Sequence, residues 1–441
     1  MAETPVKKQR RLRPWVKYAG ALLLIYLIYM LVSRCWPHAE ATPEPSQPAQ
    51  QVVQLNDTLT NAMSDCTALE PMEREIEKHL SRWEIKGAQL AVTRHDSLLF
   101  CKGFGWADEE RGEAMTPGHI MRIASVSKLL TAVGVMKLQE MGRLKLSDKV
   151  FGPDGILSDQ QFTDAIRDKR YFQITVEHLL RHQGGFTNRM GDPMFSTRYI
   201  MMREHLTTPP TNEQLLRIFL KYGLAFTPGT SQRYSNFGYM ILSLIMQRCA
   251  GMPYEQFMRQ QVLAPAGCHD FHIAGNYYED RRPNEVRYYM HDTAEPIDEF
   301  NNSGRKVVKC YGENDIPRLQ GAGAWCASAA ELSRFIAAID GMPGIPDILS
   351  ASSIEAMTRE MPNHAFSLGW NFTPSRQPWN RTGTLSGTSA LVLVYPDGEC
   401  WIILTNTSTW KGQGFAKDNT AFFNRLRNRY SHLFPARNLF P

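Results

Sequence analysis

RIASVSKLLTAVGVMKLQEMG, residues 122–142, is the stretch from which the fold and chemistry of this 441-residue chain can be argued. Its apolar residues recur at helical spacing, and Gly142 is suited to ending a helix, so the pattern predicts a helix over 125–141. Ser125 and Lys128 lie three positions apart, so one helix face carries both hydroxyl and amine. An amine placed in this way can remove the hydroxyl proton and make the serine a nucleophile. Because the spacing is common by chance, the argument depends on later motifs.

Two later motifs supply the groups that an activated serine needs. YSN at 234–236 follows TPGT at 227–230, a turn that delivers Tyr234 to the entrance of a helix. A phenol has a pKa of about 10, and two nearby cations can lower it enough for the phenolate to act as a base. RTGT at 381–384 leads into an apolar strand, where the glycine lets substrate approach the strand edge. We expect the N–H groups of Ser125 and Thr384 to form an oxyanion hole.

Strand patterns occur near both ends of the globular part, and helical patterns lie between them. Two hairpins are predicted, with strands over 89–93 and 98–104 and over 390–395 and 400–405. Helices are predicted over 72–83, 236–250 and 415–430, and after capping boxes at Thr211 with Gln214 and at Ser328 with Glu331. This order predicts an α+β fold: an antiparallel sheet built from both ends of the domain, flanked by helices, with an all-helical subdomain. Ligands favour the crevice between such lobes.

Composition and charge exclude a nucleic-acid-binding function. The chain is 43% hydrophobic and 21% charged, which is ordinary for a globular protein. Its net charge of +5 is concentrated before residue 18, where six lysines and arginines precede an apolar run, and the remainder is close to neutral. No basic stripe interleaved with aromatic residues follows.

The apolar run over 18–32 predicts membrane insertion. With its flanks the segment is about 22 residues, or about 33 Å as a helix. We assign 1–17 to a cytoplasmic basic tail, 18–36 to a transmembrane anchor, 37–65 to an extended linker and 66–441 to the globular domain. The basic cluster keeps the N-terminus inside, so a single-pass protein in the cell membrane carries its domain on the extracytoplasmic (periplasmic) side. The alternative is a signal peptide cleaved near Ala41. We favour a retained anchor because the polar gap over 33–38 is long for a signal peptide.

Cysteines and possible metal ligands give weaker signals. Seven cysteines lie beyond the anchor, so at least one is unpaired. Cys310 with Cys326 is a candidate disulfide, while burial as small apolar side chains is favoured for most of the others. CHDFH at 268–272 contains metal-ligand residue types, but further ligands at a familiar spacing are missing from the sequence. We therefore expect no metal and no organic cofactor.

The motifs resemble the serine β-lactamase and D-alanyl-D-alanine carboxypeptidase superfamily, and its class C β-lactamase-like branch in particular. The opening stretch carries the likeness together with ITVEHLLRHQGGF, FTPGTSQRYSNFGYMIL, GAGAWCASAAELSRF and RTGTLSGTSALVLVYP, which occur in family order between residues 66 and 410. The resemblance implies a β-lactamase/transpeptidase-like fold and an acyl-enzyme mechanism in which Ser125 attacks a carbonyl. Lys128 and Tyr234 would share proton transfer, and which of them is the principal base stays open. Further residues implied in substrate binding and the oxyanion hole are Asn236, Arg381, Thr382, Gly383 and Thr384.

Two positions depart from the family pattern. Arg381 stands where lysine or histidine is usual, and arginine keeps the positive field but cannot exchange a proton at physiological pH. We expect it either to steer Tyr234 towards its phenolate or to grip a substrate carboxylate with its two-pronged fork. HQGG at 182–185 stands where relatives often carry hydroxyl residues. His178 and His182 are expected to satisfy helix ends rather than to act in catalysis.

The sequence therefore predicts a membrane-anchored, extracytoplasmic serine hydrolase that acts through an acyl-enzyme on amide or ester bonds. Substrates of the β-lactam or D-alanyl peptide type are expected. The alternatives are an esterase of the same fold and a non-catalytic module that binds cell-wall fragments. The expected partners are a small-molecule or peptide substrate and the membrane, while the oligomeric state stays open.

Overall fold

The computed structural model describes residues 54–291, 293–362 and 365–441. The predicted cytoplasmic tail, the transmembrane anchor and most of the predicted linker lie outside these ranges. Within them, no helix combines the length and the apolar character that a membrane crossing requires.

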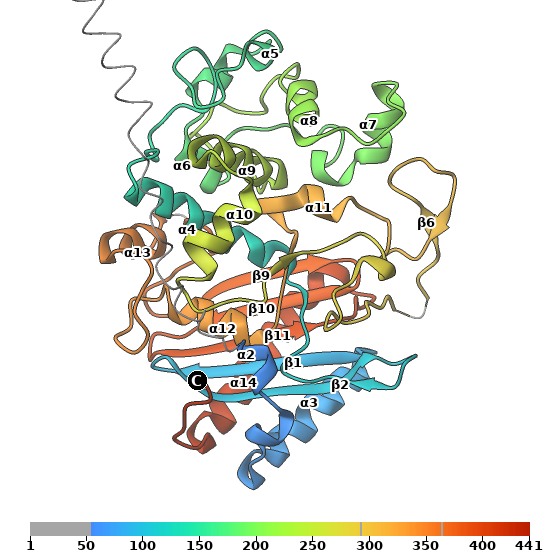
Figure 1. Cartoon of the computed structure of the whole chain (residues 1–441), viewed down its shortest axis with the longest axis vertical. Coiled ribbons are helices and arrows are strands. Elements are labelled where there is room, and N and C mark those ends of the chain that lie inside the picture. Colours follow the sequence, from blue (N-terminus) through green and yellow to red (C-terminus); the bar gives the residue numbers. More distant parts are fainter. Residues whose placement is uncertain (1–53, 292, 363–364) are drawn as a thin grey trace, which may run out of the picture. The chain divides into compact units, whose positions relative to one another are not determined.

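An antiparallel sheet joins the two ends of the domain. Within the described residues it has six strands, in the order β3-β2-β1-β11-β10-β9. Their bounds are β1 Gly87–Arg94, β2 Ser97–Asp108, β3 Glu113–Ala114, β9 Trp379–Leu385, β10 Thr388–Val394 and β11 Glu399–Thr405. The first hairpin meets the last through β1 and β11, whose register sets Leu90 opposite Ile403. Figure 1 shows the blue strands β1 and β2 beside the orange strands β9 to β11. The sheet predicted from both ends of the domain is confirmed.

Alternating side chains give the sheet two buried faces. On one face Leu90 and Trp401 pack in a core with α3 (Glu70–Arg82) and α14 (Phe415–Tyr430). On the other face Ala91 and Ile402 belong to the larger core, which continues into α12 (Ala329–Ala337) and the helical part of the domain. Successive residues of a strand point to opposite faces, so β1 and β11 serve both cores. Figure 1 shows α3 and α14 on one side of the sheet and the helices α4 to α10 on the other.

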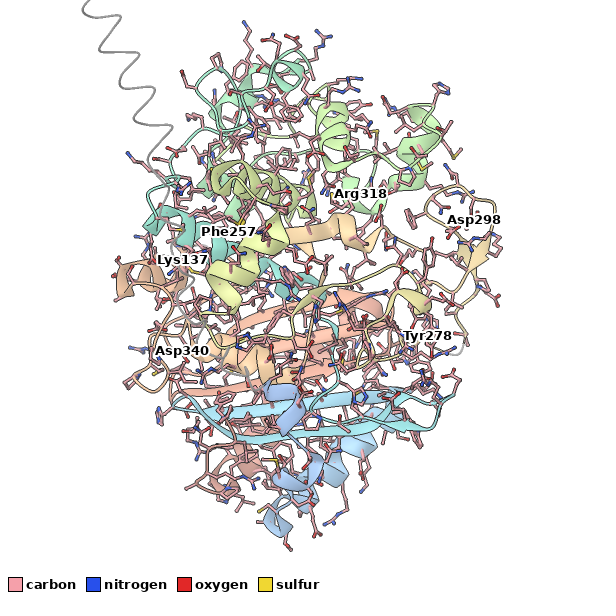
Figure 2. The ribbon with its side chains drawn as sticks, viewed as in Figure 1. Lys137, Phe257, Tyr278, Asp298, Arg318 and Asp340 are labelled. Carbon is pink, nitrogen blue, oxygen red and sulfur yellow. The ribbon has the colours of Figure 1, made fainter. Side chains whose placement is uncertain are left out.

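The helical part and its connections form the second lobe. Its helices are α4 Ser127–Glu140, α5 Gln160–Thr163, α6 Val176–Leu180, α7 Thr197–Arg203, α8 Asn212–Phe219, α9 Asn236–Ala250, α10 Tyr254–Met258 and α11 Ile316–Leu319. Further helices are α2 Leu55–Thr58 and α13 Ala351–Thr358, and the short strands are β4 Met121–Arg122, β5 His272–Ile273, β6 Ile297–Asp298, β7 Lys306–Val307 and β8 Trp325–Ala327. Arg318 of α11, labelled in Figure 2, donates to Thr197 Oγ1 at 2.9 Å and so ties α11 to the start of α7.

Two helix details differ from the sequence-based expectations. The helix expected from residue 125 begins at Ser127, because Ser125 belongs to a preceding 3-10 turn, η3 (Ala124–Val126). Ser328 caps α12, but the Glu331 carboxylate turns away and accepts from the backbone of His269 and Asp270. The capping box predicted there is therefore only half formed.

The cysteines also differ from one expectation. All seven cysteines of the described residues are free, so Cys310 and Cys326 do not form a disulfide. Both are buried around Tyr288: the Cys326 sulfur lies 3.6 Å from its hydroxyl, and the Cys310 thiol faces its carbonyl oxygen at 3.4 Å. Burial as small side chains is the outcome for five of the seven cysteines in these ranges.

The body of the domain begins before the predicted boundary at residue 66. Leu55 and Leu59 are buried in the larger core. The Asn56 amide donates to Asp270 at 2.6 Å, and its oxygen accepts from Ser328 at 2.6 Å. Two leucines four residues apart give too little periodicity to indicate a helix, which is why the sequence pattern missed this segment.

Candidate active site

Ser125 and Lys128 lie one turn apart where η3 passes into α4. The Lys128 ammonium donates to Ser125 Oγ at 3.1 Å, to Asn236 Oδ1 at 2.7 Å and to the Ala322 carbonyl at 2.5 Å. Its side chain is fully buried. A Cβ at Gly321 would lie 2.8 Å from Thr131 Oγ1, so glycine lets the segment that carries Ala322 pass close to α4. Three acceptors thus hold the amine beside the hydroxyl.

Burial and neighbouring charges together lower the pKa values of both the amine and the phenol. Desolvation lowers the pKa of Lys128 to about 8, against the opposing effect of Tyr234 and with help from Arg381. For Tyr234, burial alone would raise the pKa, but the positive charges of Lys128 and Arg381 outweigh it and bring the pKa down to about 8. The phenol is also hydrogen-bonded to Lys128 and Ser125. Both groups can therefore exchange protons near neutral pH.

Asn236 is the first residue of α9, which Ser235 caps by accepting from the Gly238 N–H. Its amide group donates to Asp192 Oδ2 at 2.8 Å, which directs the amide oxygen towards Lys128. Asp192 itself precedes a short 3-10 turn and accepts from the Met194 N–H at 2.9 Å. Sequence patterns gave no indication of Asp192, because nothing near it in the chain marks it as a partner of Asn236.

Arg381 lies on β9 with 1% of its surface exposed. Its Nε and one terminal nitrogen donate to the Ser125 carbonyl at 2.8 and 2.7 Å, and that terminal nitrogen also lies 3.3 Å from the Tyr234 hydroxyl. The other terminal nitrogen donates to Asn371 Oδ1 at 2.8 Å. All three nitrogens of the Arg381 guanidinium thus contact groups of the protein itself. Of the two roles expected for Arg381, the geometry matches the one that steers Tyr234.

Asn371 fixes this guanidinium and was missed by sequence reasoning. Its amide nitrogen donates to Asn380 Oδ1 and to Thr382 Oγ1, both at 3.1 Å, so its oxygen is turned towards Arg381. The segment that carries it packs beside β9, with Phe372 bridged to Asn380. A lone asparagine in a loop has no spacing signal that could have indicated this contact.

β9 and η3 approach each other at Gly383. A Cβ there would lie 2.3 Å from the Ile123 carbonyl and 3.0 Å from the Ser125 nitrogen, so only glycine permits the approach. Thr384 follows, paired with Ser389 of β10, and lines a pocket of about 410 Å³ together with Leu385 and Trp410. The strand edge predicted to receive substrate therefore lies beside Ser125.

Comparison with known proteins places this geometry in a family. The family model named Beta-lactamase matches residues 72–423. The chain belongs to the beta-lactamase family. It is 24% identical over 405 residues to a putative penicillin-binding protein of Bacillus subtilis, a match that covers 90% of this chain and 91% of the relative. It is 25% identical over 297 residues to an esterase of Burkholderia gladioli, covering 63% of this chain and 72% of that one.

Solved structures support the same fold. The D-amino acid amidase of Ochrobactrum anthropi has a TM-score of 0.64 at 19% identity, and the match covers 83% of this chain and 99% of that one. The chain is thus a serine hydrolase of the β-lactamase fold, as the motifs predicted.

His182 satisfies a helix end, as expected, because it accepts from the N–H of Ser235, the N-cap residue of α9, and it also lies against Tyr234. Its ring lies 4.5 Å from the Tyr234 ring, centre to centre, and its Nδ1 accepts from the Ser235 N–H at 3.1 Å. Burial first, and then the Lys128 and Arg381 charges, hold the pKa of this imidazole well below 6.5, so it stays neutral. His182 therefore supports Tyr234. His178 likewise satisfies a helix end, because its Nδ1 accepts from the N–H of Thr175, the N-cap residue of α6, at 3.3 Å.

The metal-ligand types at 268–272 have structural partners. Asp270 accepts from Asn56 and Asn284, and it contacts His272 Nε2 at 2.8 Å. In the part of the chain that the structure describes, no group of three His, Cys, Asp or Glu side chains is arranged to hold a metal ion.

Proposed function

We propose that this chain cleaves amide or ester bonds through an acyl-enzyme formed on Ser125. The supporting observation is that the hydroxyl of Ser125, the amine of Lys128 and the phenol of Tyr234 lie together. Lys128 Nζ is 3.1 Å from Ser125 Oγ, and the Tyr234 hydroxyl is hydrogen-bonded to both side chains. As Oγ bonds to the carbonyl carbon, its proton passes to the phenolate or the amine. Asn236 holds the ammonium in place.

The reaction then proceeds in two halves. The carbonyl electron pair moves to its oxygen, where the N–H groups of Ser125 and Thr384 stabilise it; loss of one such donor typically costs about 10²–10³ in rate. The C–N or C–O bond breaks, and the leaving group takes the proton that Ser125 released. Water then attacks the acyl carbon and gives a proton to the same base. The bond between the acyl carbon and Ser125 Oγ breaks, Oγ takes the proton from the base, and the carboxylic acid leaves.

Substrates of the β-lactam or D-alanyl peptide type are the first candidates. The similarity to a putative penicillin-binding protein over nearly the whole chain supports this choice. A simple ester is the second candidate, and the buried Arg381 favours it. Because its fork is engaged by Ser125 and Asn371, it cannot grip a substrate carboxylate without breaking those bonds.

A labelling experiment tests the proposal. We expect a fluorescent penicillin or a fluorophosphonate to label the wild-type protein covalently, and Ser125→Ala to remain unlabelled by both. Competition by D-alanyl peptides or by short-chain esters then ranks the two substrate classes. Equal labelling of wild type and Ser125→Ala would refute Ser125 as nucleophile. If neither reagent labels the wild type, the non-catalytic alternative is favoured.

We also propose that 18–36 anchors the protein, with its domain outside the cytoplasm. The basic cluster and the apolar run of the sequence support this placement. Protease added to intact spheroplasts should digest the domain, and alkaline carbonate should fail to release the full chain from membranes. A variant that lacks 1–36 should fractionate as soluble protein. Protection of the domain from protease would refute the orientation.

A further inference from the structure

Three arginines border one pocket in the helical lobe. The pocket has a volume of about 690 Å³ and lies between the loop at 187–190, the end of α7 and the segment at 222–225. Arg189 comes from the loop, Arg203 ends α7, and Arg233 directly precedes Tyr234. The three side chains thus reach the same cavity from three separate segments.

The charges of these arginines are not neutralised by the protein. Arg203 donates to the Met190 sulfur at 2.8 Å and lies 5.1 Å from the centre of the Tyr222 ring. Arg233 lies 5.9 Å from the centre of the Phe226 ring. Across the described ranges none of the three forms an ion pair, whereas Arg170 and Arg198 nearby each pair with an aspartate. Sulfur and ring contacts orient a guanidinium without cancelling its charge.

Two carboxylates beside this pocket are engaged by other groups of the protein. Asp168, behind Gly223, is held by Arg170 and by the Leu224 N–H, which keeps its pKa at about 2. Glu204 accepts from the Tyr222 hydroxyl at 3.4 Å. No acidic side chain lines the cavity among the described residues. The pocket therefore has three positive charges and no counter-charge of its own.

We propose that this pocket binds a phosphate-bearing organic ligand. A phosphomonoester carries about 1.5 to 2 negative charges and three strong acceptor oxygens, so it can engage more than one guanidinium at once. A carboxylate has a single charge and satisfies one arginine fork. The volume greatly exceeds that of a water molecule, which is about 30 Å³. The Tyr222 ring and Met190 offer surface for an organic group beside the phosphate.

The location connects the pocket to the candidate active site. The Arg233 N–H donates to the His182 carbonyl at 2.9 Å, and Tyr234 follows directly. The loop that carries Arg189 leads into Asp192, the partner of Asn236. A bound ligand would contact both segments. The proposal concerns binding alone and is independent of the proposed hydrolysis, so it is tested in the Ser125→Ala background.

Calorimetric titration in a low-salt buffer free of phosphate provides the test. The probes are glycerol 3-phosphate, a monoester, and glycerophosphoglycerol, a diester. The pocket variant is Arg189→Gln with Arg203→Gln, which leaves the segment before Tyr234 intact. Its matched control is Arg111→Gln with Arg143→Gln, two exposed arginines outside the pocket, so that both variants lose the same net charge. We expect the pocket variant to lose about tenfold or more in affinity, equivalent to about 1.4 kcal/mol, and the control to change less than about twofold.

The outcomes separate the possibilities. Loss of affinity for the monoester alone indicates that the pocket requires the second charge of a phosphomonoester, and equal loss for both probes indicates that it also accepts a phosphodiester. Should the double variant fold poorly, Arg203→Lys keeps the charge but removes the fork, and we expect it to bind several-fold more weakly. Absence of binding to wild type at millimolar probe, or equal losses in the pocket and control variants, would overturn the proposal.

Discussion

Burial, their mutual interaction and the charge of Arg381 set the protonation states of Lys128 and Tyr234. Both have pKa values of about 8, because burial disfavours the ammonium while the nearby cations favour the phenolate. A base is most useful when its pKa lies near the working pH. Arg381 contributes a second positive charge close to the Tyr234 hydroxyl.

Replacing Arg381 therefore should shift the pH dependence of hydrolysis. Whether the amine or the phenol is the base, its deprotonated form is the active one, so kcat/KM should rise as pH increases through about 8. Arg381→Gln removes a charge that lowers the pKa of Tyr234, and we expect the rising limb to move up by about one unit, or about 1.4 kcal/mol. Arg381→Lys keeps the positive charge, so the rising limb should stay at the same pH while kcat falls. The pH profile of ester hydrolysis measures both, and a limb unchanged in Arg381→Gln would refute the electrostatic role.

Asn371 should act on the same limb through Arg381. Asn371→Asp places a carboxylate where the amide oxygen now lies 2.8 Å from the guanidinium, which offsets its charge. We expect the limb to move to higher pH, as in Arg381→Gln. Asn371→Ala keeps the charge of Arg381 but frees its fork, so kcat should fall with a smaller shift. A purely structural role for Asn371 would lower kcat in both variants and leave the limb in place.

At the scale of elements, the sequence predicted most of what carries the site. The periodicity over 236–250 matches α9 to the residue, and both hairpins form as expected. These features are local, because period and turn residues act within a few positions. Asp192, Asn371 and the role of His182 are set by contacts between segments far apart in the chain. Nothing in the local sequence encodes such contacts, so they emerged only from the fold.

The junction of β9 with η3 is the element contact that should tolerate least change. A Cβ at Gly383 would lie 2.3 Å from the Ile123 carbonyl, so Gly383→Ala must push the strand away from Ser125. We expect a loss of about 1–3 kcal/mol in unfolding free energy, together with loss of labelling. The control is Gly238→Ala in α9, where the nearest atom lies 3.6 Å away. Alanine favours a helix by up to about 1 kcal/mol over glycine, so denaturant melts of this control should show unchanged or higher stability.

At the scale of the whole molecule, one carboxyl pair should make stability depend on pH. Asp96, in the first hairpin turn, accepts from the N–H groups of Gly344 and Ile345. Asp340 is hydrogen-bonded to it, and burial first, then the charges of Asp96 and Asp347, raise its pKa to about 8. The unfolded carboxyl has a pKa of about 3.9. The folded state therefore holds this proton more tightly, and stability falls as pH rises between these two values.

Asp340→Asn removes this titration and keeps a hydrogen-bonding group. The wild-type Tm should drop between about pH 6 and pH 8.5, and the variant should show a smaller drop. Scanning calorimetry at both values measures the difference. Asp298→Asn, at a carboxylate on the β6 hairpin, is the matched control and should leave the slope between these pH values unchanged; both aspartates are labelled in Figure 2. Equal slopes in wild type and Asp340→Asn would refute the raised pKa of Asp340.

The start of the folded domain is testable by truncation. If the domain began at residue 66, removal of the preceding residues would leave the free energy of unfolding unchanged. The structure instead buries Leu55 and Leu59 and joins Asn56 to Asp270 and Ser328. We expect a chain over 54–441 to melt as a stable domain and one over 66–441 to lose several kcal/mol, since each fully buried leucine contributes about 1.5–3 kcal/mol. Asn56→Ala in the longer chain should by itself cost about 1–3 kcal/mol, because it leaves buried partners unsatisfied. Equal melting temperatures of the two chains would mean that residues 54–65 do not stabilise the domain.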